Sequence, residues 1–291
     1  MLNLYRYISF EDFVNLVVLK KDRYNYPANW DDGYEGFLFS NMETEDEIKT
    51  LVSIMYKGIF SENYNAVIDN VLNMSKYKLT THAQCWTTHA ESDAMWQIYS
   101  YQNKAVRIKT NYDKLLAHAK KIYPKNPVVL EEIIYDADKL MDVQSQIDLM
   151  RDSRKVYETY LHKRPAFSHE SEYRILVGPI DFITEADANT IKSCQRQVDV
   201  FVATVKPSTD EIIIKMTELL HYICNNSIRK NILEEKKKYM LLMRDKHITD
   251  FIEGVMVHPN AEDWYVNIIK ELCEVHKLNF EGQSQIYKLK K

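Results

Sequence analysis

Two glutamates stand where they could share one reaction. Glu170 and Glu172 flank a serine directly before an apolar segment, and alternate residues of an extended chain point to the same side. Two carboxylates on one side influence each other's titration. One of them could accept a proton or polarise a hydroxyl, while the other orients a substrate or stabilises positive charge. The alternative is that both are surface residues that form ion pairs with Arg174 or Lys163.

An arginine inside a short apolar segment is a second candidate. Residues 2–7 alternate as a strand does, so that Leu4 and Arg6 share one face and Tyr5 and Tyr7 the other. A guanidinium in this position could bind a phosphate or a carboxylate through two parallel hydrogen bonds. The alternative is an ion pair with one of the many acidic residues.

A run of thiol, aromatic and hydroxyl side chains is the third candidate: Cys85, Trp86, Thr87, Thr88 and His89. Two hydroxyl residues at the end of a strand could hydrogen-bond either a ligand or their own backbone. We expect the cysteine to be buried and inert, because strand cysteines usually are. His82 and His89 lack an evident third ligand, so no metal site is predicted.

The loop of residues 30–35, with the sequence Trp-Asp-Asp-Gly-Tyr-Glu, holds three acids and a glycine. Such a composition could bind calcium, but the spacing differs from that of an EF-hand loop. We therefore interpret the loop as a turn in which aspartate side chains cap the neighbouring backbone.

Composition argues against several classes of protein. The 291 residues carry a net charge of −4, which argues against a surface covered with nucleic-acid contacts. No apolar run approaches the ~20 residues that cross a bilayer, and residues 1–6 lack the pattern of a signal peptide. The 4 cysteines have no CxxC spacing, so neither a zinc site nor a disulfide framework is indicated. We expect a cytoplasmic protein with reduced cysteines and no membrane contact.

Strands and helices interleave irregularly along the chain. Residue patterns predict strands at 2–7, 80–88, 105–109, 132–135, 173–178, 199–205, 252–257 and 283–289. They predict helices after residue 9, between 44 and 77, and at 93–99, 112–123, 137–161, 210–244 and 264–276. Ser9, Thr44 and Ser92 are the expected N-caps. The fold class is therefore α+β, with a mixed, largely antiparallel sheet core and several peripheral helices.

The chain offers few places at which it could divide into separate units. Its 6 glycines and 7 prolines leave little material for flexible linkers and none for a glycine-rich phosphate loop. We expect a single domain over residues 1–291, with helical insertions at about 41–78, 137–162 and 210–245. The charged run at 234–238 is interpreted as a solvated helix face.

In this order, these pieces resemble the microbial family catalogued as domain of unknown function 2971 (DUF2971), and the resemblance runs along nearly the whole chain. Residues 4–7 resemble its opening strand, and residues 30–35 resemble its aromatic-Asn-Asp-Pro-x-Glu loop. Residues 170–174 resemble its Glu-x-Glu-aromatic-Arg strand entry. The family usually has a glycine near Ala105, where this chain departs from it. The most specific block comprises Cys85, Trp86, Thr87, Asp93, Met95, Trp96 and Tyr99.

A looser resemblance is to the mono-ADP-ribosyltransferases. That superfamily places an arginine or histidine on its first strand, hydroxyl residues on a middle strand and a catalytic glutamate, often in Glu-x-Glu, at a late strand entry. Arg6, Thr87 with Thr88, and Glu170 with Glu172 occur in that order. The resemblance implies an ADP-ribosyltransferase-like fold and NAD as the substrate.

The same resemblance implies roles for single residues. Arg6 would bind the phosphates or ribose of NAD, and the region of Thr87 would shape the nicotinamide pocket. Glu172 would stabilise the oxocarbenium-like centre and polarise the acceptor, with Glu170 assisting. The residues assigned in this way to NAD binding are Tyr5, Arg6, Trp86, Thr87, Thr88, Trp96 and Tyr99.

Three functions follow from these patterns. The first is an NAD-dependent ADP-ribosyltransferase-like effector of a microbial defence or toxin system that modifies a protein or a nucleic acid. The second is a non-enzymatic sensor that binds a partner of an antiviral system, with Trp30, Trp86 and Trp96 serving fold and recognition. The third is a magnesium-dependent nuclease that uses Glu170, Glu172 and Asp93. The enzyme hypothesis requires Arg6, Thr87 and Glu172 to line one cleft.

Overall fold

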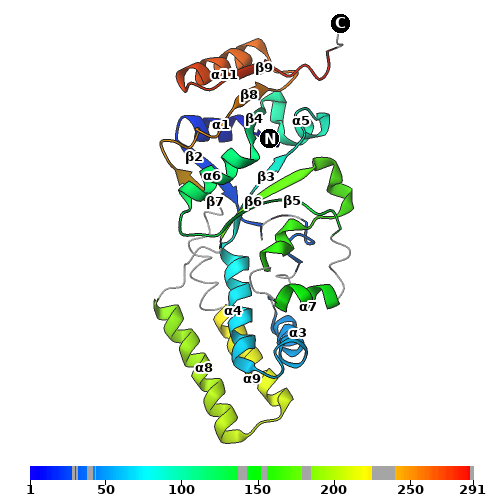
Figure 1. The fold of residues 1–291 in the computed structure, drawn as a ribbon, viewed down its shortest axis with the longest axis vertical. Coiled ribbons are helices and arrows are strands. Elements are labelled where there is room, and N and C mark those ends of the chain that lie inside the picture. The colour runs from blue at the N-terminus through cyan, green and yellow to red at the C-terminus, as the bar shows by residue number, and fades with distance from the viewer. Residues whose placement is uncertain are drawn as a thin grey trace.

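The computed structural model describes residues 1–27, 30, 32–37, 42, 44–136, 143–151, 156–178, 185–224 and 240–288. Within these residues the chain forms one 9-stranded sheet with helices at both ends of the molecule (Figure 1). Its main path runs β5 (Val128–Glu132), β6 (Glu172–Val177), β3 (His82–Thr87), β1 (Asn3–Ile8), β4 (Val106–Asn111), β8 (Gly254–Val257) and β9 (Phe280–Gln283). The remaining two strands are β2 (Lys21–Asn25) and β7 (Met240–Arg244). Neighbouring strands are antiparallel except for the parallel pair of β8 and β9.

Strand β3 lies where the sheet divides. On one side it pairs with β6 along its whole length, from His82 opposite Val177 to Thr87 opposite Glu172. On the other side it has two partners, because β1 pairs with its end at Thr87 and β2 pairs with its start. The strands β1 and β2 therefore diverge from one edge of β3. A space between two diverging strands exposes side chains that a continuous sheet would cover.

Helices beside the sheet are positioned by their caps and by apolar packing. The Ser9 side chain accepts a hydrogen bond from the Asp12 backbone at the start of the helix Phe10–Val17. The Ser92 side chain accepts one from the Met95 backbone at the start of the helix Asp93–Tyr99, so both predicted N-caps are confirmed. One apolar core under these helices includes Phe13, Trp86 and Ile269, whereas Met95 and Trp96 pack with Tyr7 in a separate cluster. The helices on this side are α1 (Phe10–Val17), α5 (Asp93–Tyr99), α6 (Tyr112–Ile122) and α11 (Asp263–Val275).

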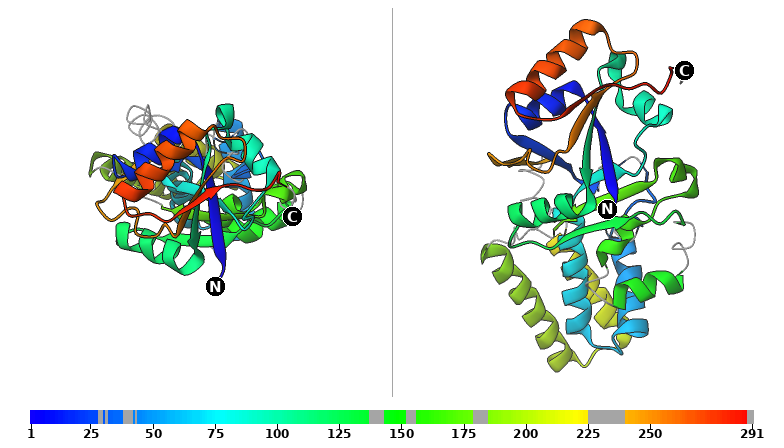
Figure 2. Two further views of the ribbon diagram at one scale, coloured as in Figure 1. Left: turned by 90° about the horizontal axis from the view of Figure 1, so that it is seen from above. Right: turned by 45° about the horizontal axis from the view of Figure 1, so that its top comes forward.

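A second group of helices extends away from the sheet (Figures 1 and 2). It comprises α3 (Glu45–Ile54), a π-helical turn (Met55–Ile59), α4 (Tyr64–Thr80), α7 (Val143–Arg151), α8 (Glu185–Val205) and α9 (Thr209–Tyr222). Thr44 and Glu47 form a capping box at the start of α3, as expected for the predicted N-cap. These helices bury their own apolar core, which includes Ile48, Val71 and Met216.

The α+β class and the largely antiparallel sheet are confirmed, whereas several predicted segments are wrong. Residues 199–205, predicted as a strand, form the end of α8. Cys194, Val198 and Val202 recur there every four residues and pack on the helical core, which outweighs the local strand preference of a valine-rich run. The helix predicted at 210–244 is confirmed over α9, residues 225–239 lie outside the described residues, and Met240–Arg244 instead form β7. The strand β7 pairs with β2, which the sequence had not indicated as a strand.

Smaller differences concern the ends of elements. Strand β5 ends at Glu132, where the strand predicted at 132–135 should begin, and β9 precedes the segment predicted at 283–289. The long helix predicted at 137–161 appears as α7 and a separate 3-10 helix (Val156–Leu161). The charged run at 234–238 lies outside the described residues. Among the described helices, none combines the length and apolar character needed to cross a bilayer.

Candidate functional site

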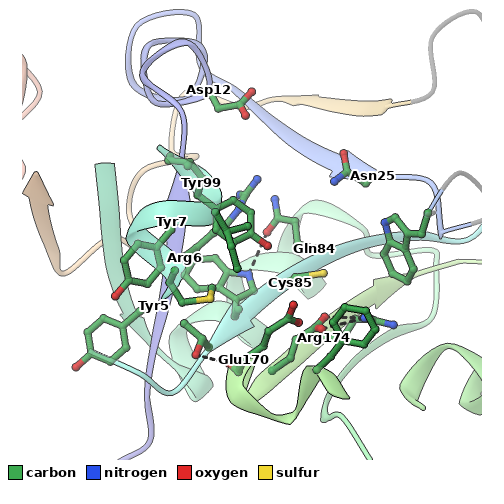
Figure 3. A pocket seen from close by; sticks show the side chains of 18 of the residues that line it. Tyr5, Arg6, Tyr7, Asp12, Asn25, Gln84, Cys85, Tyr99, Glu170 and Arg174 are labelled. Atoms are coloured by element: carbon green, nitrogen blue, oxygen red, sulfur yellow. Dashed lines mark hydrogen bonds and ion pairs between the residues drawn. The ribbon is translucent and has the colours of Figure 1, made fainter. Parts of the chain in front are cut away.

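A cavity of about 660 Å³ opens where β1 and β2 leave the edge of β3 (Figure 3). This volume lies within the range of small-molecule sites. Arg6, Thr87 and Glu172 all line the cavity, so the geometric requirement of the enzyme hypothesis is met. Further lining comes from α5, the loop at residues 30–35 and the segment at 163–170.

Glu172 and Arg174 form the buried floor of this cavity. They lie two residues apart on β6 and therefore point to the same side of the sheet. Arg174 Nε donates to Glu172 Oε1 over 2.8 Å, and its Nη2 donates to Oε2 over 3.0 Å. The side chain of Arg174 is only 1% exposed and that of Glu172 only 3%. A bidentate pair of this kind holds the carboxylate in one orientation.

Lys163 joins three carboxylates in the same cluster. Its Nζ lies 2.6 Å from Glu170 Oε2, 3.3 Å from Glu172 Oε2 and 3.5 Å from Glu35 Oε1. The carboxylates of Glu170 and Glu172 therefore meet at Lys163, but the extended segment predicted to join them is wrong, because Glu170 ends a 3-10 helix (Pro165–Glu170) and Ser171 has a left-handed backbone with φ 42°. The ion pairs with Arg174 and Lys163 that were the alternative are present. Burial alone would lower the pKa of Lys163, but the surrounding carboxylates raise it above its usual value.

The protein shifts the pKa values of the Glu172 and Glu35 carboxyl groups in opposite directions. Burial alone would raise the pKa of Glu172, but Arg174 and Lys163 outweigh burial and hold this pKa below its usual value. Burial raises the pKa of Glu35, and the same two cations compensate only in part. The pKa values of two neighbouring buried carboxylates are therefore shifted apart, that of Glu172 downward and that of Glu35 upward. Such a division is typical of acid–base sites.

Cys85 lines the cavity, yet its thiol is poorly suited to nucleophilic attack. Burial raises the pKa of the thiol well above its ordinary value, and the carboxylate of Glu172 raises it further. Because only the thiolate reacts, each increase of one in the pKa lowers the reactive fraction at neutral pH about tenfold.

We expect iodoacetamide to modify Cys85 of the folded protein at least about tenfold more slowly than free cysteine at about pH 7.5. Peptide mass spectrometry after a timed reaction measures this rate. The denatured protein, in which all 4 cysteines react, serves as the control. Rapid modification of the native protein at Cys85 would contradict a raised pKa of the partly buried thiol beside Glu172.

Arg6 is engaged within the protein. Its Nη1 lies 2.9 Å from Asp22 Oδ1, and its Nη2 donates to the backbone carbonyl of Arg23 over 3.3 Å. The Gln84 side chain donates to the same carbonyl over 2.8 Å. The ion-pair alternative therefore holds for Arg6, which links β1 to β2 at the point where they diverge. Arg23, whose side chain is 41% exposed, lines the same wall.

The two threonines hold the segment that carries the glutamates. Thr87 Oγ1 donates to the Glu170 carbonyl over 2.6 Å and accepts from the backbone of His89 over 3.1 Å. The Thr88 backbone donates to the Ser171 carbonyl over 3.2 Å. The Thr87 hydroxyl therefore serves the backbone, and Thr88 does not line the cavity.

The aromatic residues predicted to bind a ring are divided between the cavity and the core. Tyr5 and Tyr99 line the cavity, and Tyr99 is partly exposed. Trp86 lines it too, but only 2% of this residue is exposed, and its Nε1 donates to Gln84 over 3.2 Å. Trp96 packs against Tyr7 in a separate apolar cluster and lies outside the lining, so the structure does not place it for ring stacking.

The loop at residues 30–35 contributes more than sequence reasoning assigned to it. The predicted turn is confirmed, because Asp32 Oδ1 accepts from the backbone of Tyr34 over 3.1 Å. Asp31 lies outside the described residues. The Arg174 guanidinium lies 4.1 Å from the centre of the Trp30 ring, and Glu35 enters the carboxylate cluster. The loop resembles the family motif that ends in a glutamate, and this final glutamate was the signal that could have indicated Glu35 as a site residue.

The three acids of the nuclease hypothesis do not meet at this cavity. Asp93 is not among its lining residues, and its carboxylate accepts a hydrogen bond from the Tyr287 hydroxyl. Within the described part of the chain, no three His, Cys, Asp or Glu side chains are arranged to hold a metal ion. The donors present therefore do not fit a magnesium site built from Glu170, Glu172 and Asp93.

Comparison with known proteins gives one match. The family described as "Protein of unknown function (DUF2971)" matches residues 95–175, a segment that includes Lys163, Glu170, Glu172 and Arg174. No curated protein and no solved structure matches the chain. The matched segment is shorter than the predicted resemblance, because it leaves out Arg6, the loop at 30–35 and β3. This match at residues 95–175 supports the resemblance to the DUF2971 family that the sequence motifs predicted.

Proposed function

We propose that this protein cleaves the bond between nicotinamide and ribose in NAD and transfers ADP-ribose to a protein or nucleic acid. We place this activity in the cytoplasm, in a microbial defence or toxin system. The observation that supports the proposal most is the meeting of Arg6, Thr87 and Glu172 around one cavity, with the pKa of Glu172 held low at its floor.

The chemistry of glycosidic bond cleavage requires a fixed negative charge. As the bond between C1′ and nitrogen breaks, positive charge develops on the ribose, and a carboxylate beside it stabilises the transition state. Glu172 meets this need because it is ionised, nearly buried and oriented by Arg174. Glu170, with a side chain that is 17% exposed, assists from the rim of the cluster.

Binding of NAD would use other residues that line the cavity. The ring of Tyr99, which is 41% exposed, offers a surface on which a base could stack, whereas Tyr5 is 8% exposed and the Arg107 guanidinium lies over its ring. Because Arg6 is already paired with Asp22, the more exposed Arg23 is better placed to reach a phosphate. Arg6 would act by keeping this wall in place.

The direct test is to incubate the purified protein with NAD labelled separately in nicotinamide and in adenine, with and without cell lysate. Release of nicotinamide together with transfer of the adenine label to a macromolecule is the expected result. If neither label changes over a range of lysates and pH values, the proposal is wrong.

A non-enzymatic sensor is the second candidate, and one observation favours it. Lys163 and Arg174 bind the carboxylates of Glu170 and Glu172 within the protein, as a network that only stabilises the fold would do. A sensor should capture the same partner whether position 172 holds glutamate or glutamine. An enzyme should lose turnover in the variant.

A further inference from the structure

We propose that Glu35 is a further catalytic residue, which takes the proton from the acceptor group as ADP-ribose is transferred. This inference rests on the proposed function and adds a third carboxylate to the two that sequence motifs indicated. Glu35 lines the cavity, so its carboxylate can touch a bound acceptor.

The carboxylate of Glu35 has an unused acceptor atom. The side chain is 6% exposed, and Oε2 lies 2.9 Å from Arg174 Nη2. Despite this short distance, Oε2 receives no hydrogen bond of acceptable geometry from the described residues. Oε1 lies 3.5 Å from Lys163 Nζ. A buried oxygen without a hydrogen bond is costly, so a donor from a ligand would stabilise it.

The position of Glu35 is set by its backbone. Its N–H donates to the Asp32 carbonyl over 2.9 Å, and the next N–H, of Gly36, donates to Thr159 over 3.3 Å. The Asp32 carboxylate also pairs with Arg164 over 3.1 Å. The turn is therefore attached to the segment that carries Lys163, which holds the carboxylate beside the cluster without requiring movement.

The charges around Glu35 favour the transfer of a proton from the acceptor to its carboxylate. Three carboxylates share two cations in the cluster, which leaves one unbalanced negative charge. Burial raises the pKa of Glu35, and a base with a raised pKa accepts a proton more readily. The charged and titratable groups that face it are Asp32, Cys85, Lys163, Glu170, Glu172 and Arg174.

The transfer step balances with these groups. The bond between C1′ of the ribose and the pyridinium nitrogen breaks, and its electron pair stays on nitrogen, so that nicotinamide leaves as a neutral molecule. A lone pair of an acceptor hydroxyl or amine forms the new bond to C1′. The acceptor proton passes to Glu35 Oε2, while Glu172 remains ionised throughout.

The test compares the transfer rates of the Glu35→Gln and Glu132→Gln variants. Glu132 is an exposed glutamate, and the one contact described for its side chain is a hydrogen bond from the Tyr173 hydroxyl, so the same change there serves as the control. We expect Glu35→Gln to lower the transfer rate by about 10²- to 10⁴-fold, with Glu132→Gln close to wild type. The transfer rate of the wild type should rise with pH as Glu35 ionises, and this rise should be absent from the variant.

Folding of the variant is checked independently by thermal unfolding at several pH values. A carboxyl whose pKa is raised by folding stabilises the native state at low pH, and this contribution is lost as pH rises through the folded pKa. The melting temperature of Glu35→Gln relative to wild type should therefore increase with pH.

Two outcomes separate this inference from the proposed function. If wild type transfers ADP-ribose and Glu35→Gln does so at a similar rate and with the same pH profile, Glu35 is not the base and the proposed function stands. If wild type leaves NAD intact, the proposed function is wrong, and so is the role of Glu35 that depends on it.

Discussion

Replacing Glu172 with glutamine is expected to reduce the rate of NAD cleavage by about 10²- to 10³-fold. The amide keeps the shape of the side chain but removes the negative charge that faces the developing positive charge on the ribose. The measurement is nicotinamide release at saturating NAD, so that a change in turnover is distinguished from a change in binding. An effect on turnover is expected, because the charge acts mainly in the transition state.

This result needs a control for folding, because Glu172 also holds Arg174 and Lys163. Glu132→Gln provides the matched surface control, and circular dichroism with thermal unfolding shows whether Glu172→Gln is native at the assay temperature. A Glu172→Asp variant, which restores the charge at a shorter reach, should recover part of the activity. Wild-type turnover in a folded Glu172→Gln protein would exclude Glu172 as the group that stabilises the transition state.

Replacing Arg174 with leucine is expected to lower the free energy of unfolding by about 3–5 kcal/mol. The guanidinium is 1% exposed, bonds both oxygens of Glu172 and the Tyr160 carbonyl, and covers the Trp30 ring. Its loss leaves buried carboxylates with Lys163 as their remaining close cation among the described residues. Urea unfolding followed by tryptophan fluorescence measures the change.

Arg151→Leu is the control for this substitution. Arg151 is 56% exposed and lies 3.4 Å from Asp148, so its loss should cost about 0–1 kcal/mol. Arg174→Lys should lower the free energy of unfolding by an amount between those of Arg174→Leu and Arg151→Leu. Lysine keeps the charge but cannot bind a carboxylate with two parallel hydrogen bonds. If Arg174→Leu lowers the free energy of unfolding no more than Arg151→Leu does, the buried cluster does not hold β6 in place.

Local features of the fold could be predicted because neighbouring residues determine them. Ser9, Thr44 and Ser92 cap their helices through bonds to residues three positions further on. The separation of Leu4 from Tyr5 and Tyr7 into two apolar clusters depends on the pleat of β1, which is likewise local. The shared side of Glu172 and Arg174 follows from the same rule.

Long-range pairing could not be predicted from these patterns. The strand β7, late in the chain, exists through its partner β2, which lies near the N-terminus. Residues 199–205 form a helix because they pack on other helices, which their local sequence does not reveal. Arg6 was equally suited to a phosphate and to an ion pair, and the position of Asp22 across the diverging strands decided between them.

The sequence by itself determined the types of residue available to the site and the order of Glu170, Glu172 and Arg174 along one strand entry. Only the tertiary structure brought Lys163 and Glu35 into contact with them, by folding a turn and a distant segment onto β6. The opposite pKa shifts of Glu35 and Glu172 arise from this packing, because burial and the distances to two shared cations exist only in the folded chain.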